Sequence, residues 1–198
     1  MTHTLHRLGS EDSLRNDFVV VAIYAHGIND NLPDSREKML RIAEILKSQK
    51  PVNMIDEFLW NLTPAIQAVY DDRNKLKAAL RLLKEEDLGI SITVSGLISE
   101  VKQVAEELGL KIHTVNLSLG VFGDKKLLPP EEILEITSMC GHHCVSPNLV
   151  RNLISEVRNG RLTPEEAAEQ LSKPCVCGVF NKSRAATLIR NIISQKRE

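Results

Sequence analysis

The cysteines are the residues of this chain with the clearest capacity for chemistry. All four lie in its C-terminal third, Cys140 and Cys144 as one pair, Cys175 and Cys177 as the other. Thiolates are nucleophiles and soft metal ligands, and two close pairs are typical of the two halves of a metal site. The sequence therefore predicts a metal centre that uses all four cysteines as ligands.

The stretch between the two pairs is predicted to form a helical hairpin. Ser146 and Pro147 open a first helix as N-cap and first helical residue, and Gly160 ends it. Thr163 and Glu166 have the spacing of a capping box and open a second helix. Because an antiparallel hairpin brings its entrance and exit together, the two cysteine pairs are expected to meet.

Each pair also lies close to a predicted helix N-terminus. Cys144 precedes the first hairpin helix, and Cys177 precedes a third helix that begins near Asn181 or Lys182. The partial positive charge at such a terminus favours thiolate over thiol. We therefore expect stabilised thiolates in both pairs.

Four thiolates suit a [4Fe-4S] cluster, and an all-cysteine zinc site is the alternative. The spacing of Cys140 and Cys144 is typical of zinc, whereas that of Cys175 and Cys177 is too tight for either a zinc knuckle or a bacterial ferredoxin. The adjacent residues His142 and His143 are candidates to replace one cysteine or to donate to the sulfurs. The identity of the metal stays open at this point.

The composition excludes several classes of function. The 198 residues are 42% hydrophobic and carry a net charge of -1, without a basic stripe interleaved with aromatics, so nucleic acid is not an expected partner. No apolar run approaches the roughly 20 residues that span a bilayer, and the polar N-terminus lacks a signal sequence. We expect a cytoplasmic protein, where paired cysteines are more often metal ligands or catalytic thiols than disulfides.

The part before the cysteines is predicted to be an α/β domain with a mainly parallel sheet, over residues 1–128. A helical metal-binding domain is expected to follow over residues 129–198. The α/β prediction rests on alternating segments, because strand and helix in turn favour parallel crossovers. The predicted strands cover residues 18–25, 90–94 and 111–119, the helices begin at Asp34, Arg73 and Leu97, and residues 52–70 are compatible with either state.

Ligands of parallel sheets bind beyond the carboxyl ends of the strands, which here carry His26, Ser95 and Gly96. These three residues are the candidates for binding a cofactor or small molecule, although glycine and serine also dominate ordinary turns. Neither a G-x-G-x-x-G nor a Walker A sequence is present, so nothing points to a nucleotide.

Three functions compete on this evidence. The first is an iron-sulfur protein with a redox or small-molecule-processing role, whose partner is a small molecule or a redox protein and whose last helix is available for a homodimer. The second is a zinc-stabilised interaction module without catalysis. The third is a thiol enzyme, with Cys140 or Cys175 as nucleophile and His142 or His143 as base.

Overall fold

The computed structural model describes residues 7–117 and 120–195 and contains a single four-stranded sheet in this part of the chain. Its strands are β1 (Phe18–Ile23), β2 (Asn53–Met54), β3 (Ala65–Tyr70) and β4 (Ser91–Ser95). Their spatial order is β2-β3-β1-β4, and every hydrogen-bonded pair is antiparallel.

Helices make up most of the remaining structure. Those before and around the sheet are α1 (Glu11–Leu14), α2 (Ser35–Ser48), α3 (Arg73–Glu86) and α4 (Ile98–Glu107), with the short 3-10 turns η1 (Glu57–Leu59) and η2 (Lys125–Leu127). The C-terminal helices are α5 (Glu131–Thr137), α6 (Pro147–Arg158), α7 (Pro164–Ser172) and α8 (Lys182–Gln195).

The prediction of a mainly parallel sheet is wrong, and the reason lies in residues 52–70. This stretch forms β2, the turn η1 and β3, and β2 pairs with β3 as antiparallel neighbours. The hairpin adds one reversal of the chain after α2, so β3 returns antiparallel to β1 instead of parallel to it. Strands β3 and β4 then flank β1 in the same direction, with α3 as the crossover of a split β-α-β unit.

The predicted last strand, residues 111–119, is also absent from the part of it that the structure describes. Residues 111–117 follow α4 as an irregular segment, and residues 118–119 lie outside the described ranges. A groove of about 620 Å³ lies between this segment and β4. Strand β4 therefore remains an edge of the sheet.

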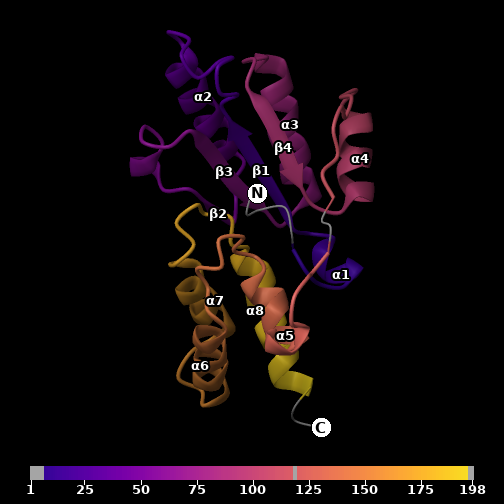
Figure 1. Ribbon diagram of the computed structural model, residues 1–198, viewed down its shortest axis with the longest axis vertical. Helices are drawn as coiled ribbons and strands as arrows, with labels where there is room; N and C mark the ends of the chain where they lie inside the picture. Colours follow the sequence, from indigo (N-terminus) through magenta and orange to yellow (C-terminus); the bar gives the residue numbers. More distant parts are fainter. Residues whose placement is uncertain (1–6, 118–119, 196–198) are drawn as a thin grey trace.

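Two apolar cores lie on the two faces of the sheet. Figure 1 shows helices α5 to α8 gathered together below the sheet and the helices α2 to α4. On one face, Phe18, Val20 and Tyr70 pack against α2 and α3. On the other face, Val19 and Val21 join the core of the helices α5 to α8. Alternate residues of β1 thus serve different cores, which explains why its sequence is apolar at every position.

The helical hairpin is confirmed with the caps expected from the sequence. The Ser146 side chain accepts a hydrogen bond from the Leu149 amide at the start of α6. Thr163 and Glu166 form the reciprocal capping box at the start of α7. Local sequence is sufficient to define both helix starts, because the capping groups lie within one turn of the backbone they satisfy.

Candidate functional site

The hairpin and the loop before α8 bring the four cysteines into one cluster. The sulfurs of Cys175 and Cys177 lie 3.7 Å apart. The Cys140 thiol interacts with the thiols of both Cys175 and Cys144. Nδ1 of His142 lies 3.7 Å from the Cys177 sulfur, and the Cys144 thiol points at the His142 carbonyl oxygen at 3.9 Å.

Two turns of the same construction carry the two pairs. In the first, the His143 amide donates to the Cys140 carbonyl oxygen at 2.9 Å, and His143 has a left-handed φ of 56°. In the second, the Gly178 amide donates to the Cys175 carbonyl oxygen at 2.9 Å, and Gly178 has a φ of 69°. Each turn therefore reverses the chain three residues after its first cysteine.

The turns aim backbone amides at the sulfurs. The N-H groups of His142 and Cys144 hydrogen-bond to the Cys140 sulfur and lower its pKa. Two larger effects, described below, raise the same pKa. The N-H group of Val179 acts in the same sense on the sulfurs of Cys175 and Cys177. Amides that converge after a left-handed residue form a concavity suited to an anion, and the anion available here is a thiolate.

Crowding of the thiols opposes this effect. Contact with Cys175 and burial raise the pKa of Cys140 far above its usual value. Cys140 lowers the pKa of Cys175, but Cys177 and burial outweigh it, so that the pKa of Cys175 rises to about 11. Contact with Cys175 lowers the pKa of Cys177. Desolvation and contact with Cys140 raise the pKa of Cys144. The expectation of a stabilised thiolate at Cys144 is therefore wrong. Of the four cysteines, only Cys177 has a lowered pKa.

These shifts predict that the metal-free protein loses stability in alkali. A thiol whose pKa is raised by folding contributes stability below its unfolded pKa and loses it as the pH rises through the folded value. For Cys175 this loss of stability occurs between pH 9.0 and about pH 11. We expect the free energy of unfolding by urea, measured with a chelator, to fall by on the order of 2 kcal/mol across it.

Protein saturated with a metal is the control for this experiment, because coordinated thiolates do not titrate in that range. Buried Tyr70, whose pKa burial also raises, contributes equally to both samples. Equal slopes with and without metal would contradict the prediction.

The second cysteine turn is seated against the sheet. A Cβ atom added at Gly178 would lie 2.0 Å from the Met54 carbonyl carbon, so the loop backbone packs directly on β2. The Asn53 side-chain amide donates to the Phe180 carbonyl oxygen at 3.1 Å. The position of Cys175 and Cys177 therefore depends on the sheet as well as on the hairpin.

The cluster is not a closed coordination shell as it stands. Within residues 7–117 and 120–195, no three or more histidine, cysteine, aspartate or glutamate side chains converge on a common point that would hold a metal ion. The thiols instead contact one another in the order Cys144, Cys140, Cys175, Cys177. Thiols are soft donors, and backbone amides are already directed at three of the sulfurs.

The residues predicted to bind a small molecule do not come together. In the register of β1 with β4, Ser95 pairs with Val19 near the start of β1, whereas His26 follows its other end. Since the strands are antiparallel, their carboxyl ends lie at opposite ends of the sheet. Ser95 and Gly96 line the groove beside β4, and His26 forms an exposed pair with Asp30, 2.6 Å from Nδ1 to Oδ2.

Gly96 has a packing role in this structure. A Cβ atom there would lie 2.9 Å from the Phe18 ring and 3.3 Å from Val101. The absence of a side chain at Gly96 thus lets the start of α4 approach β1, which accounts for the glycine without a ligand.

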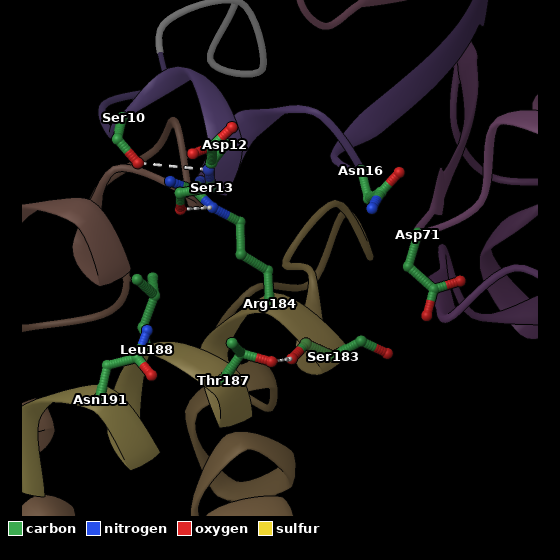
Figure 2. A pocket seen from close by; sticks show the side chains of 10 residues that line it. All are labelled: Ser10, Asp12, Ser13, Asn16, Asp71, Ser183, Arg184, Thr187, Leu188 and Asn191. Carbon is green, nitrogen blue, oxygen red and sulfur yellow. Dashed lines mark hydrogen bonds between the residues drawn. The ribbon is translucent and has the colours of Figure 1, made fainter. Parts of the chain in front are cut away.

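A polar cavity of about 450 Å³ lies between α1 and α8 (Figure 2). Two of the side chains that line it hydrogen-bond within the protein. Nε of Arg184 donates to Ser13 Oγ at 3.0 Å, and the Thr187 hydroxyl donates to the Ser183 carbonyl oxygen at 3.1 Å. The cavity lining is thus stabilised by internal hydrogen bonds, and Arg184 in particular is committed to the fold.

Some residues of the cysteine cluster escape analysis of the sequence alone. Gly178 directly follows Cys177, and a glycine at that place is the signal that indicates a left-handed turn. The contact of the Gly178 loop with Asn53 and Met54 has no signal in the local sequence, because these residues lie more than 100 positions away in the chain.

Comparison of the chain with protein-family models, curated proteins and solved structures found no match. None of the helices in the described ranges has the length and apolar character needed to cross a membrane. The functional conclusion therefore rests on the cysteine cluster itself.

Proposed function

We propose that the protein is a zinc-stabilised interaction module in which Cys140, Cys144, Cys175 and Cys177 take up one zinc ion. The observation that carries this proposal is the pair of matched turns, each with a left-handed residue three positions after its first cysteine and amides aimed at sulfur. Turns of this kind favour thiolates, and the Cys140 thiol of one turn contacts the Cys175 thiol of the other.

The distance between the sulfurs of the second pair is compatible with a shared zinc ion. A tetrahedral site with zinc-sulfur bonds of about 2.3 Å has sulfurs about 3.8 Å apart. The distance of 3.7 Å between Cys175 and Cys177 agrees with that edge. Cysteines that ligate different irons of a [4Fe-4S] cluster lie farther apart, because the inorganic core stands between them.

Zinc would also relieve the crowding of the thiols. Neighbouring thiols resist ionisation together, as the raised pKa values of Cys140 and Cys175 indicate. A bound dication removes this repulsion and holds all four as thiolates. The ion would then join the entrance of α6 to the loop that rests on β2, and so fasten the helical part to the sheet.

The test is metal analysis of protein purified anaerobically without chelators. We expect one zinc per chain and, on loading the metal-free protein at pH 7, release of about three to four protons per zinc. Chelation should expose the amides of α6 to α8 to hydrogen exchange, since structural zinc contributes on the order of 10 kcal/mol in small zinc domains. Stoichiometric iron and sulfide, with broad visible absorption, would contradict the proposal.

Two variants provide a matched comparison for this test. Cys140→Ser removes a buried ligand and is expected to abolish stoichiometric zinc. His143→Gly keeps the left-handed turn, because glycine adopts its φ of 56° without strain, and is expected to retain zinc fully. Loss of zinc from His143→Gly would show that His143 is a ligand and that the set of four cysteines is incorrect.

A further inference from the structure

The edge of the sheet at β4 has a hydrogen-bonding pattern that follows from the register of the strands. In the part of the chain that the structure describes, β1 is the only strand paired with β4. The Tyr24 amide donates to the Pro64 carbonyl oxygen at 3.2 Å, which extends the register of β1 with β3. Hydrogen-bonded pairs alternate along an antiparallel strand, so the even-numbered residues of β1 bond to β3 and its odd-numbered residues bond to β4.

This alternation determines which backbone groups of β4 face outward. Val21 pairs with Thr93, so the N-H and C=O groups of Thr93 point toward β1. Those of Ile92 and Val94 therefore point away from β1, along the open edge of the sheet. Within residues 7–117 and 120–195, none of these four groups forms a hydrogen bond. They present two donors and two acceptors, the pattern that one further antiparallel strand satisfies.

The groove beside these groups has room for such a strand. Its volume is about 620 Å³, and its far side is formed by residues 110–116, where the chain turns back after α4 (Figure 1). Five residues of extended chain span about 16 Å, so the groove has a mean cross-section of roughly 40 Å². A strand takes up about 4.8 Å of the width of a sheet, and sheets pack about 10 Å apart, which gives a similar area.

The lining of the groove favours apolar side chains on one face of the added strand. Ile92 and Val94 are half-buried and pack against the same core as Val101 and Leu110, and all four line the groove. Side chains directly opposite each other in paired strands lie on the same face of the sheet. Ligand residues opposite Ile92 and Val94 would therefore project to the face that holds Val101 and Leu110, where apolar side chains fit.

The groove carries more positive than negative charge at the end where β4 begins. Lys84 and Lys111 line it together with Asp87. Lys84 lies in the last turn of α3, shortly before β4, and its ammonium donates to the Leu108 carbonyl oxygen at 2.6 Å, close to Lys111 in the chain. A strand antiparallel to β4 has its C-terminus at this end. Its terminal carboxylate would therefore lie beside the two lysines.

From these observations we infer that the groove beside β4 binds the extended C-terminal segment of a partner protein, which joins the sheet as a fifth, antiparallel strand. Main-chain hydrogen bonds with Ile92 and Val94 supply the affinity. Two apolar side chains, two residues apart, and the terminal carboxylate supply the selectivity. This surface belongs to the sheet and does not depend on a bound zinc ion.

The experiment measures binding of a fluorescein-labelled peptide that ends in Thr-Val-Thr-Val-Thr with a free carboxylate to the full-length protein. In the inferred register, its valines lie opposite Ile92 and Val94. We expect saturable binding. Methylation of the two valine nitrogens keeps the side chains but removes two donors, and should weaken binding at least about tenfold. Amidation of the C-terminus should weaken it about threefold or more at low salt.

Variants of the protein test the same groups from the other side. Val94→Pro removes one outward N-H group and leaves the hydrogen bonds of Thr93 to β1 in place, since proline is tolerated on edge strands in this orientation. It should weaken binding about tenfold. Val94→Ala keeps the N-H group and is the control for the lost side chain. Lys111→Gln should weaken binding of the carboxylate peptide and leave binding of the amidated peptide unchanged.

Equal affinity of the parent and N-methylated peptides for the wild-type protein would overturn the inference, as would no binding at millimolar peptide. Hydrogen exchange of the free protein provides a further test, because the amides of Ile92 and Val94 should exchange rapidly. Slow exchange in a monomer would show that residues 111–117 cover the edge, and slow exchange in a dimer that a second copy does; either result overturns the inference. Zinc content is measured separately, so failure of peptide binding is distinguishable from failure of the proposed zinc site.

Discussion

Asp17→Asn is expected to lower the free energy of unfolding by about 3–5 kcal/mol, because it leaves two buried guanidinium groups without their shared carboxylate. The Asp17 side chain is 0% exposed, and those of Arg7 and Arg184 are each 4% exposed. The carboxylate oxygens lie 2.9 Å from Arg7 Nη1 and 3.0 Å from Arg184 Nη1. The Asn181 side-chain amide also donates a hydrogen bond to the Asp17 carboxylate, at 2.9 Å.

This buried cluster joins parts of the chain that are distant in sequence. Asp17 immediately precedes β1, Asn181 precedes α8, and Arg184 lies in its first turn. Arg184 also donates to the Leu8 carbonyl oxygen at 2.6 Å. Loss of the central charge should therefore loosen the attachment of α8 to the sheet, in addition to lowering overall stability.

The matched control is Asp34→Asn, which removes an exposed carboxylate 2.9 Å from Lys38. An exposed pair of this kind contributes at most about 1 kcal/mol. Urea unfolding of both variants measures the difference. Equal changes in the two variants would contradict the assignment of Asp17 as the charge that holds the buried cluster together.

Gly178→Ala is the second large effect, with an expected cost of about 2–5 kcal/mol. Alanine would be strained at a φ of 69°, and its Cβ atom would lie 2.0 Å from the Met54 carbonyl carbon. The backbone of β2 cannot yield as a flexible side chain would, so the loop with Cys175 and Cys177 must move. We expect weaker zinc binding together with the loss of stability.

Gly160→Ala is a close control, because Gly160 has a φ of 70° and no atom within 4 Å of an added Cβ. It isolates the backbone strain, expected at about 1–2 kcal/mol, from the clash with β2. Thermal unfolding and zinc titration of the two variants measure both effects. Similar results for Gly160→Ala and Gly178→Ala would show that the contact with β2 does not determine the position of the loop.

Much of the secondary structure was predictable from local sequence. The apolar spacing of Leu76, Ala79, Leu80 and Leu83 predicts α3, and all four are buried in it. The caps of α6 and α7 lie where Ser146 and Thr163 indicate. These features depend on contacts within one or two helical turns, so a single stretch of sequence contains all the residues that form them.

The direction of the strands was not predictable in the same way. Residues 52–70 contain a short hairpin whose first strand, β2, has only two residues, Asn53 and Met54. Such a strand has too few residues to show an alternating pattern. A prediction that omits β2 also omits one reversal of the chain, so the predicted sheet is parallel where the observed sheet is antiparallel. The omission also places His26 and Ser95 at the same end of the predicted sheet, whereas they lie at opposite ends.

By itself, the sequence determined that four cysteines in two pairs flank a capped helical hairpin, because cap chemistry and helical spacing are local. Only the tertiary structure decided that three of the sulfurs are buried and Cys144 is exposed, that Gly178 packs on β2, and that Asp17 lies between two arginines. Burial and charge pairing depend on segments that folding brings together from opposite ends of the chain, and no local pattern records which segments those are.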